Sequence, residues 1–266
     1  MGARESDPYR RLSYRRLIAW PERIAREWPF LEGELRRAPA PSVLDLGSGT
    51  GEHARHLAAR GYRAVGVDRS EEQVAAARDY EDESPPHGPR FLRGDLDALD
   101  LLTTERFGAA LCLGNVLPHL EDEALAATLR GLARRLLPAG RLVIQLVNYQ
   151  RIFARGVRHL PLSFRADPAP GGRAEDGEIV FLRLLRPDGE RHVRFYPSTL
   201  ALHPGAEPPL TVESSREVRL RAWRRPEVEA ALAAAGFRLA ATYGDMEAGP
   251  YDAEESMDLV VVATAP

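Results

Sequence analysis

Apolar, strand-like runs alternate with helical segments between Ser42 and about Val147. The runs SVLDLG, RAVGVD, RFLRGD, AALCLGN and RLVIQLVN are short, largely apolar and mostly bounded by Gly, Asp or Asn, as buried strands are. Residues 51–60, 70–79 and 121–136, which lie between these runs, have the apolar spacing of helices. Strands that alternate with helices in this way predict a parallel sheet with helices on both faces.

The flanking segments have different patterns. Residues 9–39 have helical apolar spacing that is interrupted by Pro21 and Pro29, which predicts two or three short helices. From about 155 to 221, β-rich stretches are separated by turns such as PDGE and HPGAEPP, which predicts an antiparallel subdomain. Residues 225–236 predict a helix, and the runs FRLAATYGD and MDLVVVATA that follow predict two closing strands.

These patterns together predict an α/β protein. The expected fold is a Rossmann-like, seven-stranded, mostly parallel sheet with helices on both faces, an N-terminal helical flap and an inserted antiparallel β subdomain after the fifth strand. We expect a helical cap over residues 1–40, the cofactor-binding core over 41–150, the inserted β-rich subdomain, for substrate or dimerisation, over 151–221, and completion of the core over 222–266.

Composition narrows the class of protein. The chain has 266 residues, of which 44% are hydrophobic, enough for one substantial core. Its net charge of −3 is spread over interleaved acidic and basic residues, so we expect a small-molecule substrate and neither nucleic acid nor membrane as a partner. The single cysteine, Cys112, and the lack of a leader or of an apolar run that could span a bilayer predict a cytoplasmic protein.

A glycine-rich turn follows the first predicted strand. Gly47, Gly49 and Gly51 open a helix there, which lets the backbone approach a ligand and presents N–H groups to it. Asp68 ends the next strand, where a carboxylate can accept hydrogen bonds from both hydroxyls of a ribose. The two features favour a ligand of adenosine type. In the alternative interpretation, Asp68 caps the helix that starts at Ser70, and the glycines only turn the chain.

The residues of the turn distinguish two adenosine ligands, NAD and S-adenosylmethionine. Asp45 precedes the glycines, and the spacing in DLGSGTG is G-x-G-x-G rather than the G-x-G-x-x-G of dinucleotide sites. A carboxylate at this place repels a pyrophosphate but attracts an ammonium or sulfonium group. The turn therefore favours S-adenosylmethionine.

The motifs VLDLGSGTG, VGVD, GDL and LLPAGRLVIQ resemble those of the class I S-adenosylmethionine-dependent methyltransferases, over residues 40–148 and again over 222–264. The resemblance implies S-adenosyl-L-methionine as cofactor, with Asp68 on the ribose and Asp95 on the adenine. For Asp95, a plain helix cap or turn is the alternative, with Asp97 next in line for the adenine. The resemblance and the turn assign to the cofactor Asp45, Gly47, Ser48, Gly49, Gly51, Asp68, Arg69, Asp95, Leu96, Gly114 and Asn115.

Two N-terminal side chains are candidates to close over the methionine end of the cofactor. Arg23 would pair with the methionine carboxylate, and Tyr14 would lie beside it. A solvated helix face is the alternative for both.

The stretches LCLGNVLPHL and VNYQRI resemble the glycine N-methyltransferase branch of this family and its small-molecule relatives. This resemblance implies that the acceptor pocket is lined by Asn115, His119, Asn148 and Tyr149; Tyr196, from the inserted region, is a further candidate. The glycine-specific enzymes carry an arginine directly before NY that binds the substrate carboxylate, whereas this chain has Val147. A valine cannot form that bidentate pair, so we do not expect glycine as the acceptor unless another arginine replaces it.

His119 and Tyr149 are the candidate catalytic residues. Methyl transfer from a sulfonium is an in-line displacement that needs a base only when the nucleophile arrives protonated, and His119 is the candidate base. Tyr149 would orient the nucleophile. A structural histidine and a packing tyrosine are the alternatives.

The sequence predicts no metal site, because its seven histidines are scattered and lack acidic or thiol partners at ligand spacing. His53 and His56 lie on one face of a predicted helix and are expected at the surface. The chain has no lysine, so no Walker motif exists, and Ser48 lacks the pattern of a hydrolase nucleophile.

The expected function is therefore methylation of a small molecule at nitrogen or oxygen by S-adenosylmethionine. Two alternatives stay open: a methyltransferase that acts on RNA or protein, and a non-catalytic protein that binds S-adenosylmethionine. The inserted subdomain either covers the pocket or joins two copies of the chain as a homodimer.

Overall fold

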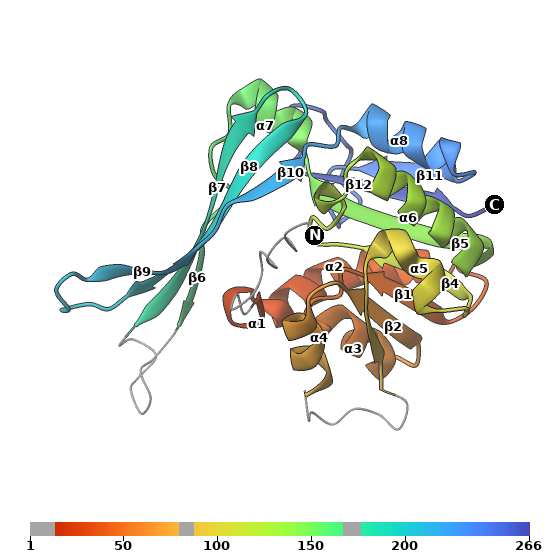
Figure 1. Ribbon diagram of the computed structural model, residues 1–266, viewed down its shortest axis with the longest axis horizontal. Helices are drawn as coiled ribbons and strands as arrows, with labels where there is room; N and C mark the ends of the chain where they lie inside the picture. The colour runs from red at the N-terminus through yellow and green to blue at the C-terminus, as the bar shows by residue number, and fades with distance from the viewer. Residues whose placement is uncertain (1–13, 80–87, 167–176) are drawn as a thin grey trace, which may run out of the picture.

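The computed structural model describes residues 14–79, 88–166 and 177–266, which form two sheets (Figure 1). The larger sheet has the strand order β11-β12-β5-β4-β1-β2-β3. Strands β1 to β5 are parallel, and β12 runs antiparallel to both β5 and β11, which confirms the predicted mostly parallel, seven-stranded sheet. The strands are β1 (Ser42–Leu46), β2 (Arg63–Asp68), β3 (Arg90–Arg93), β4 (Phe107–Cys112), β5 (Leu136–Val147), β11 (Arg238–Tyr243) and β12 (Asp258–Thr264).

Helices cover both faces of this sheet. Val43 packs in the apolar cluster beneath α2, α3 and α4, whereas Leu44 and Leu46 pack in the cluster beneath α6 and α8. Because successive strand side chains point to opposite faces, a strand that is covered on both must be apolar throughout, which explains the continuous runs in the sequence. The helices are α2 (Trp20–Leu35), α3 (Glu52–Ala59) and α4 (Glu71–Arg78) on one face, and α5 (Leu99–Leu102), α6 (Asp122–Arg135) and α8 (Arg225–Ala234) on the other.

The N-terminal segment differs from the prediction of short helices broken at both prolines. After the single turn of α1 (Tyr14–Leu17), α2 runs without a break through Pro29, and Pro21 lies in its first turn, where a missing N–H is tolerated. Leu31 and Leu35, in the turns beyond Pro29, are buried against the sheet. This packing holds the helix together across the one hydrogen bond that Pro29 cannot donate.

A separate antiparallel sheet follows the fifth strand, as predicted. Its order is β10-β8-β7-β6, and β9 pairs with the same edge of β8 as β10 does. The sheet extends from the core as a long arm, and its base is joined to the core by Leu185, Val193 and Leu220, which are buried there (Figure 1). Its strands are β6 (Ser163–Ala166), β7 (Glu178–Asp188), β8 (His192–Leu202), β9 (Leu210–Ser215) and β10 (Val218–Arg221).

Three short helices leave the carboxyl ends of the core strands. The 3-10 turns η1 (Leu96–Ala98) and η2 (Leu117–His119) follow β3 and β4, and α7 (Tyr149–Arg155) begins directly after β5. Across the described ranges, no helix has both the length and the apolar character that crossing a bilayer requires.

Candidate functional site

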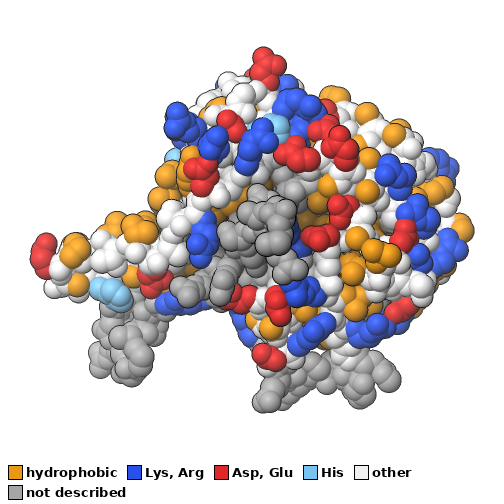
Figure 2. Space-filling view, viewed as in Figure 1, with side chains coloured by type: hydrophobic (Ala, Val, Ile, Leu, Met, Phe, Trp, Pro, Cys, Tyr) orange, Lys and Arg blue, Asp and Glu red, His pale blue; other side chains and the backbone are white. Residues whose placement is uncertain are grey.

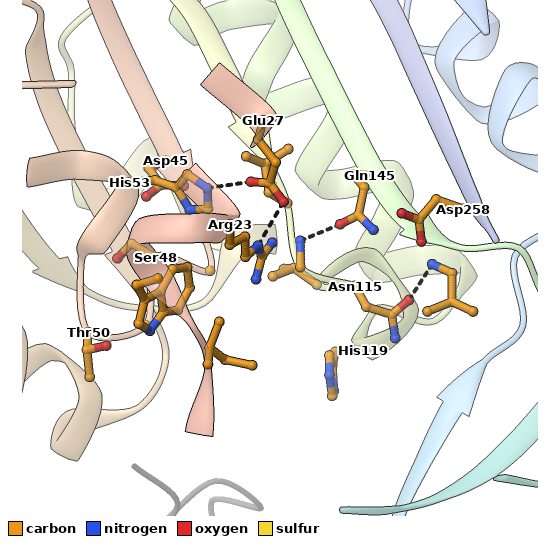
Figure 3. Close-up of a pocket in the computed structure, with 18 of the residues that line it drawn as sticks. Arg23, Glu27, Asp45, Ser48, Thr50, His53, Asn115, His119, Gln145 and Asp258 are labelled. Carbon is orange, nitrogen blue, oxygen red and sulfur yellow. Dashed lines mark hydrogen bonds and ion pairs between the residues drawn. The ribbon is translucent and has the colours of Figure 1, made fainter. Parts of the chain in front are cut away.

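A cavity of about 1090 Å³ lies where the core strands end. Its walls are the carboxyl ends of β1, β2, β4 and β5, the first half of α2, and the part of the antiparallel sheet that faces the core. The crevice at the carboxyl ends of the strands is where open α/β sheets bind ligands. Figure 3 shows the polar side chains that meet there.

The glycine turn between β1 and α3 forms one wall of the cavity. Gly47 and Gly49 line it and have positive φ angles of 66° and 53°, which glycine adopts without strain. The backbone N–H of Gly49 donates to Asp68 Oδ2 at 2.9 Å, and that of Ser70 donates to Asp68 Oδ1 at 2.9 Å. The Asp68 carboxylate is thereby held at the end of β2. Each of its oxygens can accept further hydrogen bonds, as a ribose would require.

Gly51 does not line this cavity, contrary to its expected place in the cofactor site. It caps α3 with φ of 86°, and a Cβ atom at this position would lie 2.4 Å from the Phe91 ring. The glycine is therefore required by the packing of α3 against β3, independently of any ligand.

Trp20 Nε1, Asp45 Oδ2 and Ser48 Oγ are buried polar atoms of cavity-lining residues, and none of them has a hydrogen-bond partner within the described part of the chain. Asp45 is only 3% exposed, and burial raises the pKa of its carboxyl to about 6. Buried polar groups in folded proteins are nearly always hydrogen-bonded, so these atoms indicate that a polar ligand completes the site. A cationic ligand would also offset the buried charge of Asp45.

A network that the sequence did not predict joins α2 to α3. Glu27, 4% exposed, accepts from Arg23 Nε at 2.8 Å, and its other oxygen lies 2.8 Å from His53 Nε2. Burial by itself would raise the pKa of Glu27, but the hydrogen bonds and charges of His53 and Arg23 outweigh it and lower that pKa to about 2. His53, expected at the surface, instead faces the cavity with 11% of its side chain exposed.

The residues after β2 and β3 also line the cavity. Arg69 Nε lies 3.7 Å from Asp95 Oδ1, and Leu96 beside it is buried. The Asp95 side chain is 67% exposed and makes no capping hydrogen bond to η1. Asp95 therefore does not make the hydrogen bond that a helix cap requires, and its carboxylate is free to face a ligand or solvent.

Gly114 and Asn115, after β4, are tied to β5. The N–H of Gly114 donates to Gln145 Oε1 at 2.7 Å. Asn115 has φ of 68°, its Oδ1 accepts from the N–H of Val147 at 3.0 Å, and its Nδ2 donates to the Tyr149 hydroxyl at 3.0 Å. Both residues line the cavity in a fixed orientation.

His119, at the end of η2, lines the cavity near Asn115 (Figure 3). Burial, and secondarily the charge of Arg69, lower the pKa of His119 to about 4. Its imidazole is therefore neutral at pH 7 and can accept a hydrogen bond or a proton.

Asn148, Tyr149 and Tyr196 were expected in the acceptor pocket, but the structure does not place them in the cavity wall. The chain does not continue as a strand: Asn148 caps α7 and its Oδ1 accepts from Gln150 N and Arg151 N. Tyr149, in the first turn of α7, is 1% exposed and packs in the core.

The register of β8 explains the position of Tyr196. Phe181 and Arg183 of β7 and Phe195 of β8 line the cavity. Tyr196, the neighbour of Phe195, points to the opposite face of the same sheet.

Arg23 lines the cavity as predicted, whereas the Tyr14 side chain lies outside the described residues. Further cavity residues that the sequence did not predict are Trp20, Arg26, Gln145, Arg165, Arg183, Met246 and Asp258. Trp20 and Asp258 begin α2 and β12, and Gln145 lies within β5. These elements were recognised, but the periodicity of an element does not say which of its residues meets a distant segment. Among the described residues, no group of three or more His, Cys, Asp or Glu side chains could hold a metal ion.

Residues 43–140 match the family model of a methyltransferase domain. A glycine/sarcosine N-methyltransferase from Halorhodospira halochloris is 33% identical over 142 residues, which are 53% of this chain and 52% of that protein. A dTDP-3-amino-3,6-dideoxy-alpha-D-glucopyranose N,N-dimethyltransferase from Streptomyces fradiae is 34% identical over 112 residues, 41% of each protein. The chain therefore spans about half the length, or less, of these curated relatives.

Solved structures share the fold over nearly the whole chain. An amino pentose methyltransferase from Micromonospora echinaspora, bound to S-adenosylmethionine, has a TM-score of 0.69 at 22% identity, over 100% of both chains. A methyltransferase from Streptomyces caelestis has a TM-score of 0.68 at 24% identity, over 91% of this chain and 95% of that one. At these identities the likeness is one of fold.

Proposed function

We propose that this chain, a member of the class I S-adenosylmethionine-dependent methyltransferases, transfers a methyl group from S-adenosylmethionine to a nitrogen atom of a small-molecule acceptor. The observation that carries the proposal is the juxtaposition of Asp45, the glycine turn and Asp68 at one end of the cavity. A buried carboxylate beside a second, oriented carboxylate suits a ligand that has both a cationic part and a ribose.

The cavity fits this cofactor on three grounds. Asp45 Oδ2 and Ser48 Oγ are buried acceptors without partners among the described residues, and Trp20 Nε1 is a buried donor in the same state. Gly49 leaves open space, since among the residues that the structure describes only the Gln73 side chain, at 4.0 Å, would lie within reach of a Cβ atom there. A pyrophosphate would meet the Asp45 carboxylate, so the same arrangement disfavours a dinucleotide.

Nitrogen is the acceptor atom that the relatives support. The names of the matched relatives describe methylation of glycine, sarcosine and an amino sugar, each of which reacts at nitrogen. The cavity volume of about 1090 Å³ has room for the cofactor and a small acceptor. Acidic and basic side chains are interspersed over the face in Figure 2, which supports a small acceptor rather than a nucleic acid.

In this proposal the chain positions and shields the reaction. When bound, S-adenosylmethionine would supply a sulfonium methyl group whose carbon an amine lone pair can attack in line, with the thioether sulfur as the leaving group. Gly114 and Asn115, held by Gln145, Val147 and Tyr149, provide a rigid floor where the acceptor is oriented. The neutral imidazole of His119 accepts a hydrogen bond from the acceptor nitrogen, and α2 and the antiparallel sheet exclude water from opposite sides.

The first experiment is calorimetric titration with S-adenosylmethionine, S-adenosylhomocysteine and NAD. We expect binding of both adenosyl ligands, no binding of NAD, and a loss of affinity of about 100-fold in Asp68→Ala. Asp79→Ala, at the exposed end of α4, is the matched control and should bind normally. Failure of the wild type to bind either adenosyl ligand would overturn the proposal.

Transfer itself is measured with S-adenosylmethionine that carries a labelled methyl group and a panel of small amines. A homodimer is one of the two possibilities that the sequence left open for the inserted subdomain, and light scattering after size-exclusion chromatography tests it.

A further inference from the structure

Asp258 begins β12 and lies directly opposite Val147 of β5 in the antiparallel pair. Directly opposed residues in such a pair point to the same face, and both residues line the cavity. The sheet order places β5 and β4 between β12 and β1, so Asp258 and Asp45 stand on opposite sides of the Gly114 and Asn115 loop. The cavity therefore has a carboxylate on each side of this loop.

Gln145 holds the Asp258 carboxylate in place. Its Oε1 accepts from the N–H of Gly114 at 2.7 Å, so its amide nitrogen is the group that can donate to the side chain of Asp258. Figure 3 shows the two side chains next to each other. One side-chain amide thus links the loop after β4 to the acidic group on β12. The position of the carboxylate is set by the sheet rather than by a mobile loop.

Asp258 forms no ion pair within the described part of the chain, and the nearby Arg23 pairs with Glu27 instead. Arg23, Arg26 and Glu27, all on α2, are the charged side chains that act on it electrostatically. Burial raises the pKa of Asp258 to about 6, against the effects of Gln145 and the two arginines. A half-buried carboxylate without an ion pair is stabilised by a cation that enters the cavity.

We propose that Asp258 binds the ammonium group of the acceptor, and that the acceptor is an aliphatic amine that lacks an α-carboxylate. The inference rests on the proposed function and names its substrate class. Asp45 lies beside the glycine turn, where the cationic cofactor is proposed to bind. Asp258, the second carboxylate without an ion pair, therefore suits a second cation, the ammonium group of the acceptor. An α-carboxylate on the acceptor would lie beside Asp258 and apolar Val147, where like charges repel.

The role of Asp258 in this proposal is binding and orientation. Its oxygens accept N–H hydrogen bonds from the bound ammonium, one proton then passes to the neutral imidazole of His119, and the freed lone pair forms the new nitrogen–carbon bond. The carbon–sulfur bond breaks with its electron pair kept on sulfur, and the product departs as a methylated ammonium. No further reactant is needed.

The test measures binding separately from turnover. Calorimetry titrates 2-aminoethanol, cyclohexylamine and D-glucosamine, their hydroxyl counterparts ethylene glycol, cyclohexanol and D-glucose, and glycine into the protein saturated with S-adenosylhomocysteine. We expect at least one amine to bind tenfold or more tightly than its hydroxyl counterpart and than glycine. Asp258→Asn, which keeps the shape and the contact with Gln145, should lose this preference, and Asp258→Glu should restore part of it.

Glu247→Gln is the matched control, because Glu247 is an exposed carboxylate at the rim of the same cavity and should keep the preference. In turnover, Asp258→Asn should raise KM for the amine about tenfold with little change in kcat. We expect KM of the wild type to rise below about pH 6, and the variant should lack this rise.

Amines that bind no better than their hydroxyl counterparts, or a preference that survives in Asp258→Asn, would overturn the inference. The proposed function fails by a different result, namely an absence of labelled methyl transfer to any amine while the binding preference persists.

Discussion

The Nε2 atom of His53 lies 2.8 Å from the Glu27 carboxylate, and this contact fastens the N-terminal helix α2 to α3 beside the glycine turn. Arg23 donates to the other oxygen of the same carboxylate. The Trp20 ring packs edge-on against the His53 ring, with 5.6 Å between centroids. The cavity wall formed by α2 is therefore held by polar contacts at its centre.

Glu27→Gln should lower the free energy of unfolding by about 2–3 kcal/mol at pH 7, because it removes a buried charge from two ionic hydrogen bonds. The pKa of Glu27 is about 2 in the folded chain and 4.5 ordinarily, so the loss is constant above pH 4.5 and shrinks as the pH falls toward 2. Urea unfolding at pH 7, 5.5 and 4 measures it. The control Glu32→Gln, which removes an exposed pair with Arg36 on the same helix, should change stability by less than about 0.5 kcal/mol. Equal effects of the two variants would contradict the role of Glu27.

Asp45→Asn should have opposite effects on stability and on binding. Folding raises the pKa of Asp45 from 3.8 to about 6, so its charged form opposes folding above pH 6, by up to about 3 kcal/mol, and less as the pH falls toward 4. The variant should therefore stabilise the ligand-free protein at pH 7 and weaken its binding of S-adenosylmethionine. Wild-type affinity should fall below about pH 6, and that of the variant should not. Thermal unfolding and calorimetry at pH 5 and 7.5 measure both, and a variant that is destabilised without ligand would refute the prediction.

Gly51→Ala and Gly61→Ala separate backbone strain from packing. Both glycines have positive φ angles, 86° and 84°, but a Cβ at Gly51 would overlap the Phe91 ring, whereas a Cβ at Gly61 would have no atom of the described residues within 4 Å. We expect losses in stability of about 3–4 kcal/mol for Gly51→Ala and about 1–2 kcal/mol for Gly61→Ala. Urea unfolding of the two variants gives the comparison. Similar losses would mean that Phe91 moves away without cost.

His119→Gln should lower kcat by about 10- to 100-fold while S-adenosylmethionine binds normally. With a pKa of about 4, His119 stays neutral from pH 6 to 9, so the wild-type profile of kcat/KM should have no inflection from this residue in that range. Initial rates from pH 5 to 9 for both proteins test the point. An inflection near pH 6.5 that disappears in His119→Gln would show that the imidazole titrates at its ordinary value.

Tyr149→Phe should affect stability and catalysis only through the loss of its hydrogen bond with Asn115. The Tyr149 hydroxyl is buried away from the cavity and accepts from Asn115 Nδ2 at 3.0 Å. Its removal should lower stability by about 1 kcal/mol, leave cofactor affinity unchanged and reduce kcat less than tenfold. Asn115→Ala, which removes a cavity-lining side chain, should reduce kcat more. Steady-state kinetics rank the two, and the reverse order would place Tyr149 at the reacting atoms.

The sequence by itself determined the order of the elements and the chemistry of the glycine turn. Apolar periodicity is a local property of the sequence, and so is the need for glycine at a turn with positive φ angles. For this reason a single βαβ unit was enough to assign Gly47, Gly49 and Asp68 to one wall of the ligand cavity. Both the seven-stranded sheet and the separate antiparallel sheet could be predicted from such local patterns of apolar residues and turns.

Only the tertiary structure decided which side chains from distant segments meet in the cavity. The helix that starts at Tyr149 buries this side chain, which the resemblance had placed in the pocket. Conversely, Glu27 meets His53, and Asp258 meets Val147, across sequence separations that no periodicity spans. Whether a polar side chain faces a ligand or a neighbour depends on the register and packing of elements that the chain brings together only when it folds.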